Sequence, residues 1–479
     1  MKKVYSVRSI REREKSLIES GISEDELIEK ASDLLAEEVE KIQGQRVCIF
    51  VGGGNNGSDA LSLAMKLKNK KVTVCTVGEK RNEHNSKRLE KAKSEGIEII
   101  NYRDADLSRA DVVVDGIFGI GLSREVSGEA REAIENINAC SAYKIAIDLP
   151  SGLDGDGGFA LGECVRADLT LTFFGIKQGL LVGEGRNYSG EVRVMEMGYD
   201  LPEPTALITE REDVVLPKRK IATHKGTYGN VKIIAGSPTM IGASLLAHES
   251  ALSALRSGCG YATLCVPNSL ISVYQGRIKE ELLCIMPDIV GKIAYNEPVL
   301  DDIMRNASSI VIGMGLGKNE DLIRIISYLA QNFDKTLVID GDGLNALASN
   351  FDAIKGHKAK LILTPHVGEF RRLVGENTTL TTERVRQFAQ EIKGVVAMKS
   401  ATTIISDGEK IYLNLTGTPA MAKAGSGDVL AGMIGAFSAT AEPLIATLRG
   451  CYCFGKAGER ACKKRGEYSV IASDIISEI

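Results

Sequence analysis

The chain has 479 residues, more than one hydrophobic core usually supports, so two or more domains are expected. Apolar residues make up 44% and charged residues 25%, a balance typical of globular rather than disordered or fibrous proteins. The formal net charge of −4 gives no broad attraction for nucleic acid or for an anionic membrane, so neither is an expected partner. No stretch has the length of an apolar membrane helix or the core of a signal peptide, so we expect a cytoplasmic protein.

The first half alternates short apolar runs with helical stretches. A helix is predicted over residues 23–39, because Ser23 and Glu26 have the spacing of a capping box and apolar residues follow on one face. Buried strands are predicted at residues 46–51, 71–77, 111–114, 144–149 and 168–174. Strands that alternate with helices predict a parallel sheet covered on both faces.

The pattern is interrupted between residues 198 and 226 by three prolines and a basic run at 218–220, which is typical of a domain junction. We place the boundary after Ile208, giving domains 1–208 and 209–479. Strands resume at residues 231–235, 261–266, 309–312, 336–339, 360–363 and 395–398. Residues 403–415 alternate around Asp407 and Gly408, which predicts a hairpin, so the second half is also α/β.

A glycine-rich loop, GGGNNGSD at residues 52–59, directly follows the first of these strands and opens a helix predicted to begin near Ala60. Glycines allow a backbone to approach an anion, and the free amides at a helix start donate hydrogen bonds to phosphate. A plain strand-to-helix turn is the alternative. The carboxamides of Asn55 and Asn56 favour a binding loop, since a plain turn does not need them.

Two further strand ends carry polar residues, in DGIFGIG at 115–121 and in DLPSG at 148–152. The carboxyl ends of parallel strands lie along one edge of a sheet. Asn56, Asp115 and Ser151 are therefore expected to converge as oxygen ligands of a weakly held cation. Each of them alone would more often be a cap or turn residue.

The series GGGNNGSDA, VVDGIFGIGL and IDLPSG resembles the amino-terminal domain of epimerases that act on NAD(P)HX, the hydrated forms of NADH and NADPH. The resemblance implies a Rossmann-like three-layer α/β/α fold, potassium bound by Asn56, Asp115 and Ser151, and Asp148 beside the reacting ring, where it is our candidate acid/base. Ser58 and Ala60 depart from the family's usual NNGGDG. The substrate-binding residues that it implies are Asn55, Asn56, Gly57, Ser58, Asp59, Gly119, Ile120, Gly121, Leu122, Ser123, Arg124, Glu125 and Asp148.

A second glycine loop, AGSGD at residues 424–428, precedes an apolar helix predicted over 429–437. An aspartate beside helix-start amides suits a base that removes a proton from a hydroxyl while the amides stabilise a phosphoryl group. Aspartate is also a preferred N-cap residue. From this loop alone, capping and catalysis by Asp428 remain equal alternatives.

Other segments of the second half mostly follow strands: HKGTYG at 224–229, GMGLG at 313–317, DGDGLN at 340–345, TPHVGE at 364–369 and KSATT at 399–403. The set resembles the ribokinase-like superfamily and, within it, the ADP-dependent NAD(P)HX dehydratases. Met314, Gly341, Gly343, Val367 and Ala424 depart from the usual pattern without removing a functional group. The resemblance implies that Lys399, Ser400, Ala401, Thr402, Thr403 and Gly427 bind the nucleotide and that Ala243, Gly315, His366 and Asp428 bind the hydrated dinucleotide.

The chemistry fits these residues. Hydration leaves a hydroxyl beside the ring nitrogen, and its phosphorylation gives a leaving group that the nitrogen lone pair can expel. Asp428 would act as the base, Mg²⁺ would stabilise the phosphoryl group, and ADP, the co-substrate, would leave as AMP. Epimerisation by the first half would recover the other configuration, so NADHX, NADPHX and ADP are the expected small-molecule partners of a homo-oligomer.

Two other functions remain open at this stage. A ribokinase-like kinase of a small alcohol, such as a vitamin precursor or a sugar, would release a stable phosphorylated product. A first half without catalysis would instead be a module that binds a nucleotide or a protein. HKGTYG and TPHVGE disfavour the former, through the resemblance alone, while Asn56, Asp115 and Asp148 disfavour the latter.

Overall fold

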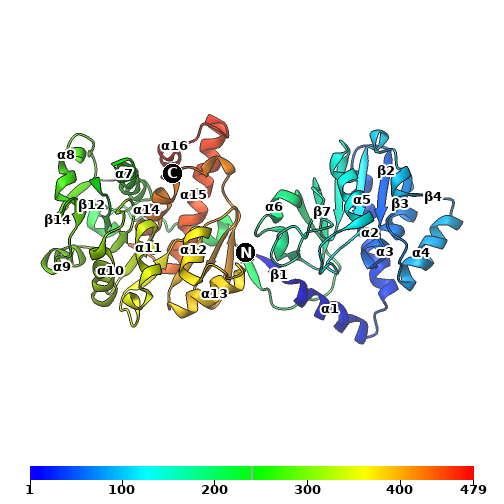
Figure 1. Ribbon diagram of the computed structural model, residues 1–479, viewed down its shortest axis with the longest axis horizontal. Coiled ribbons are helices and arrows are strands. Elements are labelled where there is room, and N and C mark those ends of the chain that lie inside the picture. Colours follow the sequence, from blue (N-terminus) through cyan, green and yellow to red (C-terminus); the bar gives the residue numbers. More distant parts are fainter. Residues whose placement is uncertain (239–240) are drawn as a thin grey trace. The chain divides into compact units, whose positions relative to one another are not determined.

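The computed structural model describes residues 1–238 and 241–479, and its packing divides the chain into two compact units. One unit is Lys3–Ala206, and the other is Leu207–Ile479 together with Met1–Lys2. The division falls two residues before the predicted boundary at Ile208. Each unit is an α/β body built on a largely parallel sheet, which confirms the predicted fold class (Figure 1).

The first unit is built on a seven-stranded parallel sheet whose order reverses next to β2. All five strands predicted in this half are present, with ends shifted by at most two residues. Because β2 and β5 lie side by side while their connections run to opposite sides, the crevice at their carboxyl ends is where an open sheet of this kind binds ligands. In spatial order the strands are β4 (Glu98–Asn101), β3 (Lys71–Thr76), β2 (Arg46–Val51), β5 (Val112–Gly116), β6 (Tyr143–Ile147), β7 (Leu169–Phe173) and β9 (Glu191–Met195).

Alternation along β2 explains the two layers of helices. Val47 and Ile49 pack on one face with α2 and α3, whereas Phe50 packs on the other face with α5. Helix α2 begins with the predicted capping box, in which Ser23 and Glu26 each accept from the other's backbone amide. The helices are α1 (Val7–Glu19), α2 (Glu24–Lys41), α3 (Asn55–Lys66), α4 (Glu83–Ser94), α5 (Gly128–Ala139) and α6 (Gly185–Tyr188), and the short strands β1 (Lys2–Tyr5) and β8 (Ile176–Lys177) pair in parallel.

The second unit has a larger sheet, in which the strands from β13 to β19 are parallel. The antiparallel hairpin β20–β21 follows β19 in the sheet, and β10 pairs in parallel with β21. The hairpin confirms the prediction, with Gly408 in its turn at φ 92°. In spatial order the strands are β13 (Leu282–Met286), β12 (Tyr261–Pro267), β11 (Asn230–Ile234), β16 (Ser309–Ile312), β17 (Thr336–Ile339), β18 (Lys360–Leu363), β19 (Val395–Met398), β20 (Thr403–Ser406), β21 (Ile411–Asn414) and β10 (Ala206–Ile208).

Helices α7 and α14 pack closely against each other in the core of this unit. The backbone of Gly432 lies so near α7 that a Cβ there would be 2.1 Å from the carbonyl oxygen of Ser250, so only glycine fits. The helices of eight or more residues are α7 (Ile241–Arg256), α9 (Glu297–Arg305), α10 (Glu320–Asn332), α11 (Gly341–Ser349), α12 (Val367–Val374), α13 (Thr382–Glu391), α14 (Ser426–Ser438) and α15 (Pro443–Arg465); α8 (Ile271–Tyr274) and α16 (Ala472–Ser477) are shorter.

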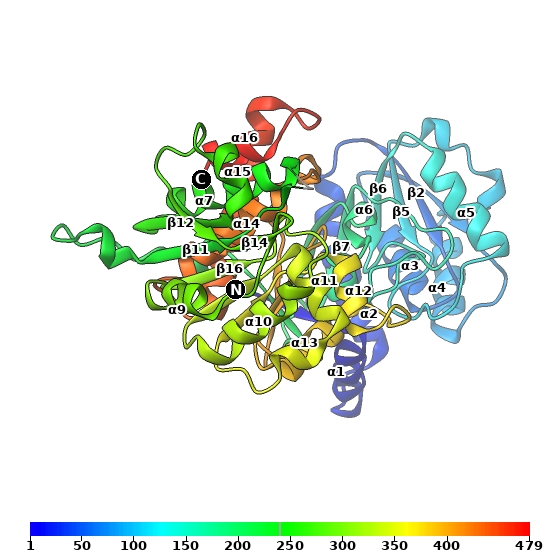
Figure 2. The same cartoon turned by 60° about the vertical axis from the view of Figure 1, so that its left-hand side comes forward.

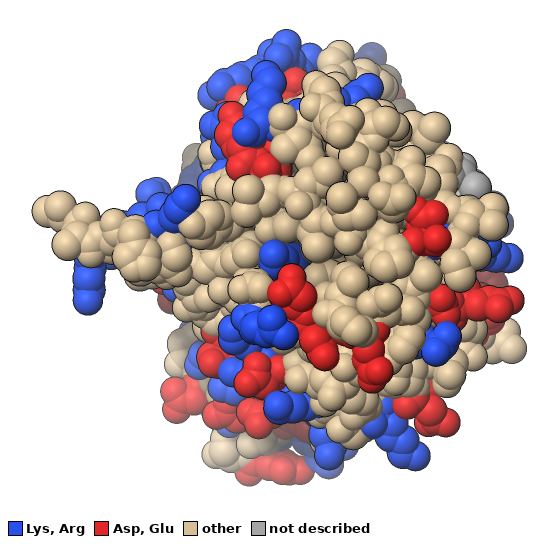
Figure 3. Space-filling view, turned by 90° about the vertical axis from the view of Figure 1, so that its left-hand side faces the viewer, with Lys and Arg blue, Asp and Glu red and all other residues tan. Residues whose placement is uncertain are grey.

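An arm precedes β11 and projects from this unit, as Figure 2 shows in green. It contains the basic run at 218–220, and Figure 3 shows basic side chains along it. Leu216 is 51% exposed and Ile221 is fully exposed, so the arm also carries apolar groups into solvent. Within the described ranges, every helix is too short or too polar to cross a bilayer.

Candidate active sites

The glycine loop between β2 and α3 is built by close backbone contacts. A Cβ at Gly52 would lie 2.1 Å from the carbonyl oxygen of Ile117, and one at Gly53 would lie 1.8 Å from that of Lys80. Any side chain at either position would collide with backbone. The loop is thereby held against the chain that follows β5.

Helix α3 begins at Asn55 rather than near Ala60, so the predicted helix start is wrong by five residues. Gly54 is the N-cap, and the Ser58 hydroxyl donates to its carbonyl at 3.3 Å, which lets a polar segment form the first helical turns. Five predicted substrate-binding residues therefore lie on the helix instead of a loop: Asn55, Asn56, Gly57, Ser58 and Asp59. Asn55 is exposed at the helix start, whereas Ser58 is fully buried.

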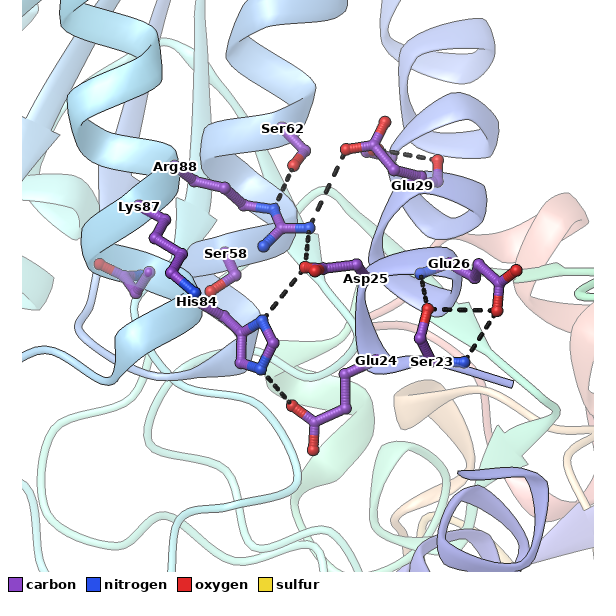
Figure 4. A network of polar contacts seen from close by, with 12 residues as sticks. Ser23, Glu24, Asp25, Glu26, Glu29, Ser58, Ser62, His84, Lys87 and Arg88 are labelled. Carbon is purple, nitrogen blue, oxygen red and sulfur yellow. Dashed lines mark hydrogen bonds and ion pairs between the residues drawn. The ribbon is translucent and has the colours of Figure 1, made fainter. Parts of the chain in front are cut away.

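Helix α3 is fixed by a network with its neighbours (Figure 4). The buried Arg88 of α4 donates to Ser62 of α3 at 2.9 Å and to Asp25 of α2 at 2.8 Å. His84 of α4 lies between Asp25, at 3.1 Å, and Glu24, at 3.2 Å. The network ties three helices together on one face of the sheet, and so it orients the amino end of α3.

Asn56, Asp115 and Ser151 meet around one backbone carbonyl. The Ser151 hydroxyl donates to Asp115 at 2.6 Å and lies 3.2 Å from the carbonyl oxygen of Phe118, to which the Asn56 amide also donates at 2.9 Å. All three side chains are buried. Burial raises the pKa of Asp115 to about 6, while hydrogen bonds from Ser151 oppose that rise.

This donor set suits a hard monovalent cation. It offers a carboxylate, a hydroxyl, a carboxamide and a backbone carbonyl, all oxygen ligands of the kind that such ions prefer. A cation here would also offset the cost of a buried carboxylate at Asp115. Among the described residues there is no cluster of three His, Cys, Asp or Glu side chains that would suit a transition metal.

Asp148 follows β6 and has a left-handed backbone, with φ 67°, which is uncommon outside glycine. Its carboxylate accepts from the ammonium of Lys177, which is only 1% exposed and also donates to Thr172 at 3.0 Å and to the carbonyl of Phe173 at 2.6 Å. All donors of the ammonium are thus used, and the lysine orients Asp148.

The turn after β5 brings the next predicted segment to the same place. A Cβ at Gly119 would lie 3.2 Å from Asn56 Oδ1 and 3.3 Å from Asp148 Oδ2, so this backbone lies between the two side chains. Ile120 and Leu122 are half-buried. The remaining predicted residues of the segment, Gly121, Ser123, Arg124 and Glu125, are exposed.

In the second unit, Asp428 is the third residue of α14 and is half-buried. The N-cap is Gly425, in a left-handed conformation with φ 87°, and no side chain caps the helix. Asp428 therefore does not cap this helix, and the capping interpretation is wrong. Burial, together with the charge of Asp340, raises the pKa of Asp428 to about 7, against the opposing charge of Lys399.

Lys399 follows β19, and its ammonium lies 2.7 Å from Asp340 Oδ1 at the end of β17. A Cβ at Gly427 would lie 3.3 Å from this ammonium, which places the loop before Asp428 directly beside the ion pair. The other residues predicted to bind the nucleotide form the turn into β20: Ser400 and Ala401 are exposed, Thr402 is buried and Thr403 begins the strand.

Gly315 follows β16 and His366 follows β18, the two strands that flank β17 in the sheet. His366 is the N-cap of α12, and its Nδ1 accepts from the amides of Gly368 at 3.0 Å and Glu369 at 3.3 Å. His366 therefore has a structural role at the start of α12, although its side chain is 55% exposed. Gly315, at φ 61°, lies against Ala243, where a Cβ would be 3.1 Å from the alanine methyl.

Sequence reasoning missed three charged residues of these sites: Lys177, Glu14 and Asp340. Lys177 and Glu14 belong to segments with no recognised motif, and only folding brings them to Asp148. Asp340 does have a signal, because it follows a strand directly within the quoted segment DGDGLN. Pairing it with Lys399, 59 residues later, required the sheet order.

Comparisons with known proteins cover both units. Residues 231–479 match the family model described as NAD(P)H-hydrate dehydratase, and residues 24–179 match the one described as YjeF-related protein N-terminus. The bifunctional NAD(P)H-hydrate repair enzyme Nnr of Thermofilum pendens is 35% identical, over 93% of this chain and 89% of its own length. The enzyme of the same name from Coxiella burnetii is 31% identical, over 99% of this chain and 98% of its own.

A solved structure supports the fold of the second unit. A ribokinase-like superfamily protein of Enterococcus faecalis is 24% identical, with a TM-score of 0.50, and the match covers 58% of this chain and 95% of that one. The predicted ribokinase-like fold is thereby confirmed. Together with the two relatives that match nearly end to end, these findings show that the chain belongs to the family of bifunctional NAD(P)H-hydrate repair enzymes.

Proposed function

We propose that the second unit dehydrates S-NAD(P)HX at the expense of ADP, releasing AMP and phosphate, and that the first unit interconverts the R and S hydrates. The observation that carries the dehydratase assignment is the position of Asp428 beside the Lys399–Asp340 pair, at the amino end of α14. A raised pKa near 7 suits a group that must both accept and release a proton at neutral pH.

In this proposal Asp428 takes the proton of the hydroxyl on the hydrated ring. The hydroxyl oxygen then attacks the terminal phosphorus of ADP. The bond between that phosphorus and the bridging oxygen breaks, and AMP leaves. Amides at the start of α14 lie where they can stabilise the transferred group, with Gly427 among them. Expulsion of phosphate by the ring nitrogen and loss of a ring proton then restore the dihydronicotinamide.

The nucleotide is proposed to lie along the turn 399–403, with Lys399 near its phosphates. Mg²⁺ bound with those phosphates would reduce their negative charge, and Asp340 is a nearby carboxylate that suits it. The hydrated dinucleotide is proposed to contact Ala243, Gly315 and His366. These three residues lie on α7 and at the ends of β16 and β18.

In the first unit, Asp148 is proposed as an acid/base group beside the reacting carbon, with Asn55–Asp59 and Gly119–Glu125 around the substrate. Asn56, Asp115 and Ser151 would hold potassium. Asn56 and Ser151 also contact the carbonyl oxygen of Phe118, and Ser151 donates to Asp115, so these side chains fix the turn at Phe118. The close approach of Gly119 to both Asn56 and Asp148 supports one common site.

One assay tests both activities. The protein is incubated with a mixture of hydrated NADH epimers and either ADP or ATP, and the absorbance of the regenerated dihydronicotinamide is followed. Complete recovery faster than spontaneous epimerisation is expected. Recovery of one epimer alone would remove the epimerase assignment, and a stable phosphorylated product without NADH would support the alternative of a small-alcohol kinase.

A homo-oligomer in the cytoplasm is also proposed. The edge strand β13 exposes Leu282 and Ile285, by 47% and 51%, and the turn after it exposes Val290 by 91%. An unpaired, apolar sheet edge is a surface that proteins usually cover. Light scattering on the chain should give the mass of an oligomer, and Val290→Asp with Ile285→Lys should lower that mass; a monomeric parent chain would contradict the proposal.

A further inference from the structure

Helix α1 reaches the candidate epimerase site although no motif lies in it and the matched family region begins only at residue 24. The guanidinium of Arg11 donates to the carbonyl oxygen of Ile120, within the turn proposed to hold the substrate. The amide of Val7 donates to Asp156 at 2.7 Å, which fixes the start of the helix. Residues three apart share a helix face, so Glu14 lies on the same side as Arg11.

The carboxyl of Glu14 belongs to a cluster around Asp148. Glu14, Asp59 and Asp148 interact with one another, and Lys177 interacts with Glu14 and Asp148. They come from α1, α3, the end of β6 and β8, and so from four separate segments. The charged groups that act on Glu14 are Asp148, Lys177, Arg11, Glu24 and Asp59.

We propose that Glu14 is a second acid/base group of the epimerase site and works in alternation with Asp148. This inference rests on the proposed epimerase function and deepens it. It assigns a reacting group to a helix that the family resemblance leaves without a role.

The reaction needs two groups in opposite protonation states. When the bond between the ring carbon and its hydroxyl breaks, the nitrogen lone pair forms a double bond to that carbon, and the oxygen leaves as water after taking one proton from an acid. Water then adds to the opposite face and gives one proton to a base. The reverse direction exchanges the two roles, so proton and oxygen are balanced in each cycle.

The two carboxyls have different surroundings. The ammonium of Lys177 donates directly to Asp148. Burial is the largest cause that raises the pKa of Glu14, to about 7, and the charge of Asp148 adds to it. At neutral pH the carboxyl of Glu14 is therefore protonated in a large fraction of molecules, so it can donate as well as accept a proton.

The test compares three variants of the full-length chain: Glu14→Gln, the conservative Glu14→Asp, and Glu12→Gln as a matched control. Glu12 lies on the same helix, but its carboxylate pairs with Arg8 and is 64% exposed. Epimerisation is followed by separating the R and S hydrates over time, from about pH 5.5 to 8.5, a span chosen to bracket the pKa of about 7. Dehydration of pure S hydrate with ADP, measured in the same samples, reports whether the second unit is folded, and urea unfolding of each chain reports whether the first unit is folded.

Glu14→Gln should slow epimerisation by about 10²-fold or more and remove the pH dependence centred near 7, while Glu14→Asp should retain that pH dependence and part of the rate. Glu12→Gln should match the parent chain, and dehydration should be unchanged in all three. A Glu14→Gln protein with the parent's rate and pH profile overturns this inference and leaves the epimerase assignment intact. A parent chain that does not accelerate epimerisation instead overturns both.

Discussion

The ammonium of Lys399 lies 2.7 Å from the carboxylate of Asp340, and Gly427 brings the start of α14 against this pair. The carboxyl of Asp428 also interacts electrostatically with both members of the pair. The arrangement combines a positive charge for phosphate with a nearby base whose pKa is raised. Each of these features can be removed separately by mutation.

Asp428→Asn should lower kcat for dehydration by about 10²- to 10⁴-fold, the range typical for loss of a general base. The amide is nearly isosteric and does not cap the helix, so stability should change little. ADP-dependent NADH formation from S-NADHX is the measurement, with epimerisation by the same sample as the control. A variant that retains most of its dehydratase rate would contradict the assignment of Asp428.

The dehydratase rate should fall as the pH drops through about 7, because Asp428 must be ionised to accept a proton and burial holds its pKa at about 7. The pKa is raised rather than lowered, so the ionised base dominates only above that pH. A profile of kcat/KM against pH reports the pKa of this group in the free enzyme. An acid limb near pH 4, the ordinary range of an aspartate, would show that another group limits the rate.

Lys399→Met should raise the KM for ADP and lower kcat/KM by more than about tenfold, because the site loses its positive charge and leaves Asp340, 4% exposed, without a partner. Lys410→Met, at an exposed position in the hairpin turn, is the matched control and should behave like the parent chain. Steady-state kinetics at several ADP concentrations separate KM from kcat. Equal KM values for the two variants would place the phosphates elsewhere.

Much of the fold was predictable because each signal was local. The run at residues 336–339 has β-branched and apolar side chains between polar ends, and β17 has the predicted bounds. The start of α3 was missed because Asn55, Asn56, Gly57 and Ser58 are weak helix formers, and their helical turn depends on contacts with Phe118 and with the network around Arg88. The roles of Glu14 and Lys177 could not be predicted, since both depend on tertiary contacts across more than 25 residues.

Potassium should stimulate epimerisation, and Ser151→Ala should weaken that stimulation. The hydroxyl of Ser151 accepts from the amide of Phe118 at 2.8 Å and donates to Asp115 at 2.6 Å, so its loss removes one ligand oxygen and loosens the turn. Initial rates are compared in KCl, NaCl and a tetraalkylammonium salt at equal ionic strength. Dehydration should respond less than epimerisation, and identical rates in all three salts would argue against a specific site.

Lys177→Met should both abolish measurable epimerisation and lower the free energy of unfolding of the first unit by about 3–5 kcal/mol, as expected when one partner of a buried ion pair is removed. The loss is expected to be large because the carboxyl of Asp148, only 7% exposed, would lose its ion-pair partner. Urea unfolding of the full chain is the measurement, and Lys68→Met, at an exposed position, is the control.

Adding Asp148→Asn to Lys177→Met should recover part of the lost stability but no epimerisation, because asparagine tolerates the left-handed backbone at φ 67° and carries no charge. If the double variant is instead less stable than Lys177→Met alone, the ion pair is not what the lysine contributes, and its contacts with Thr172 and Phe173 would be the source of the effect.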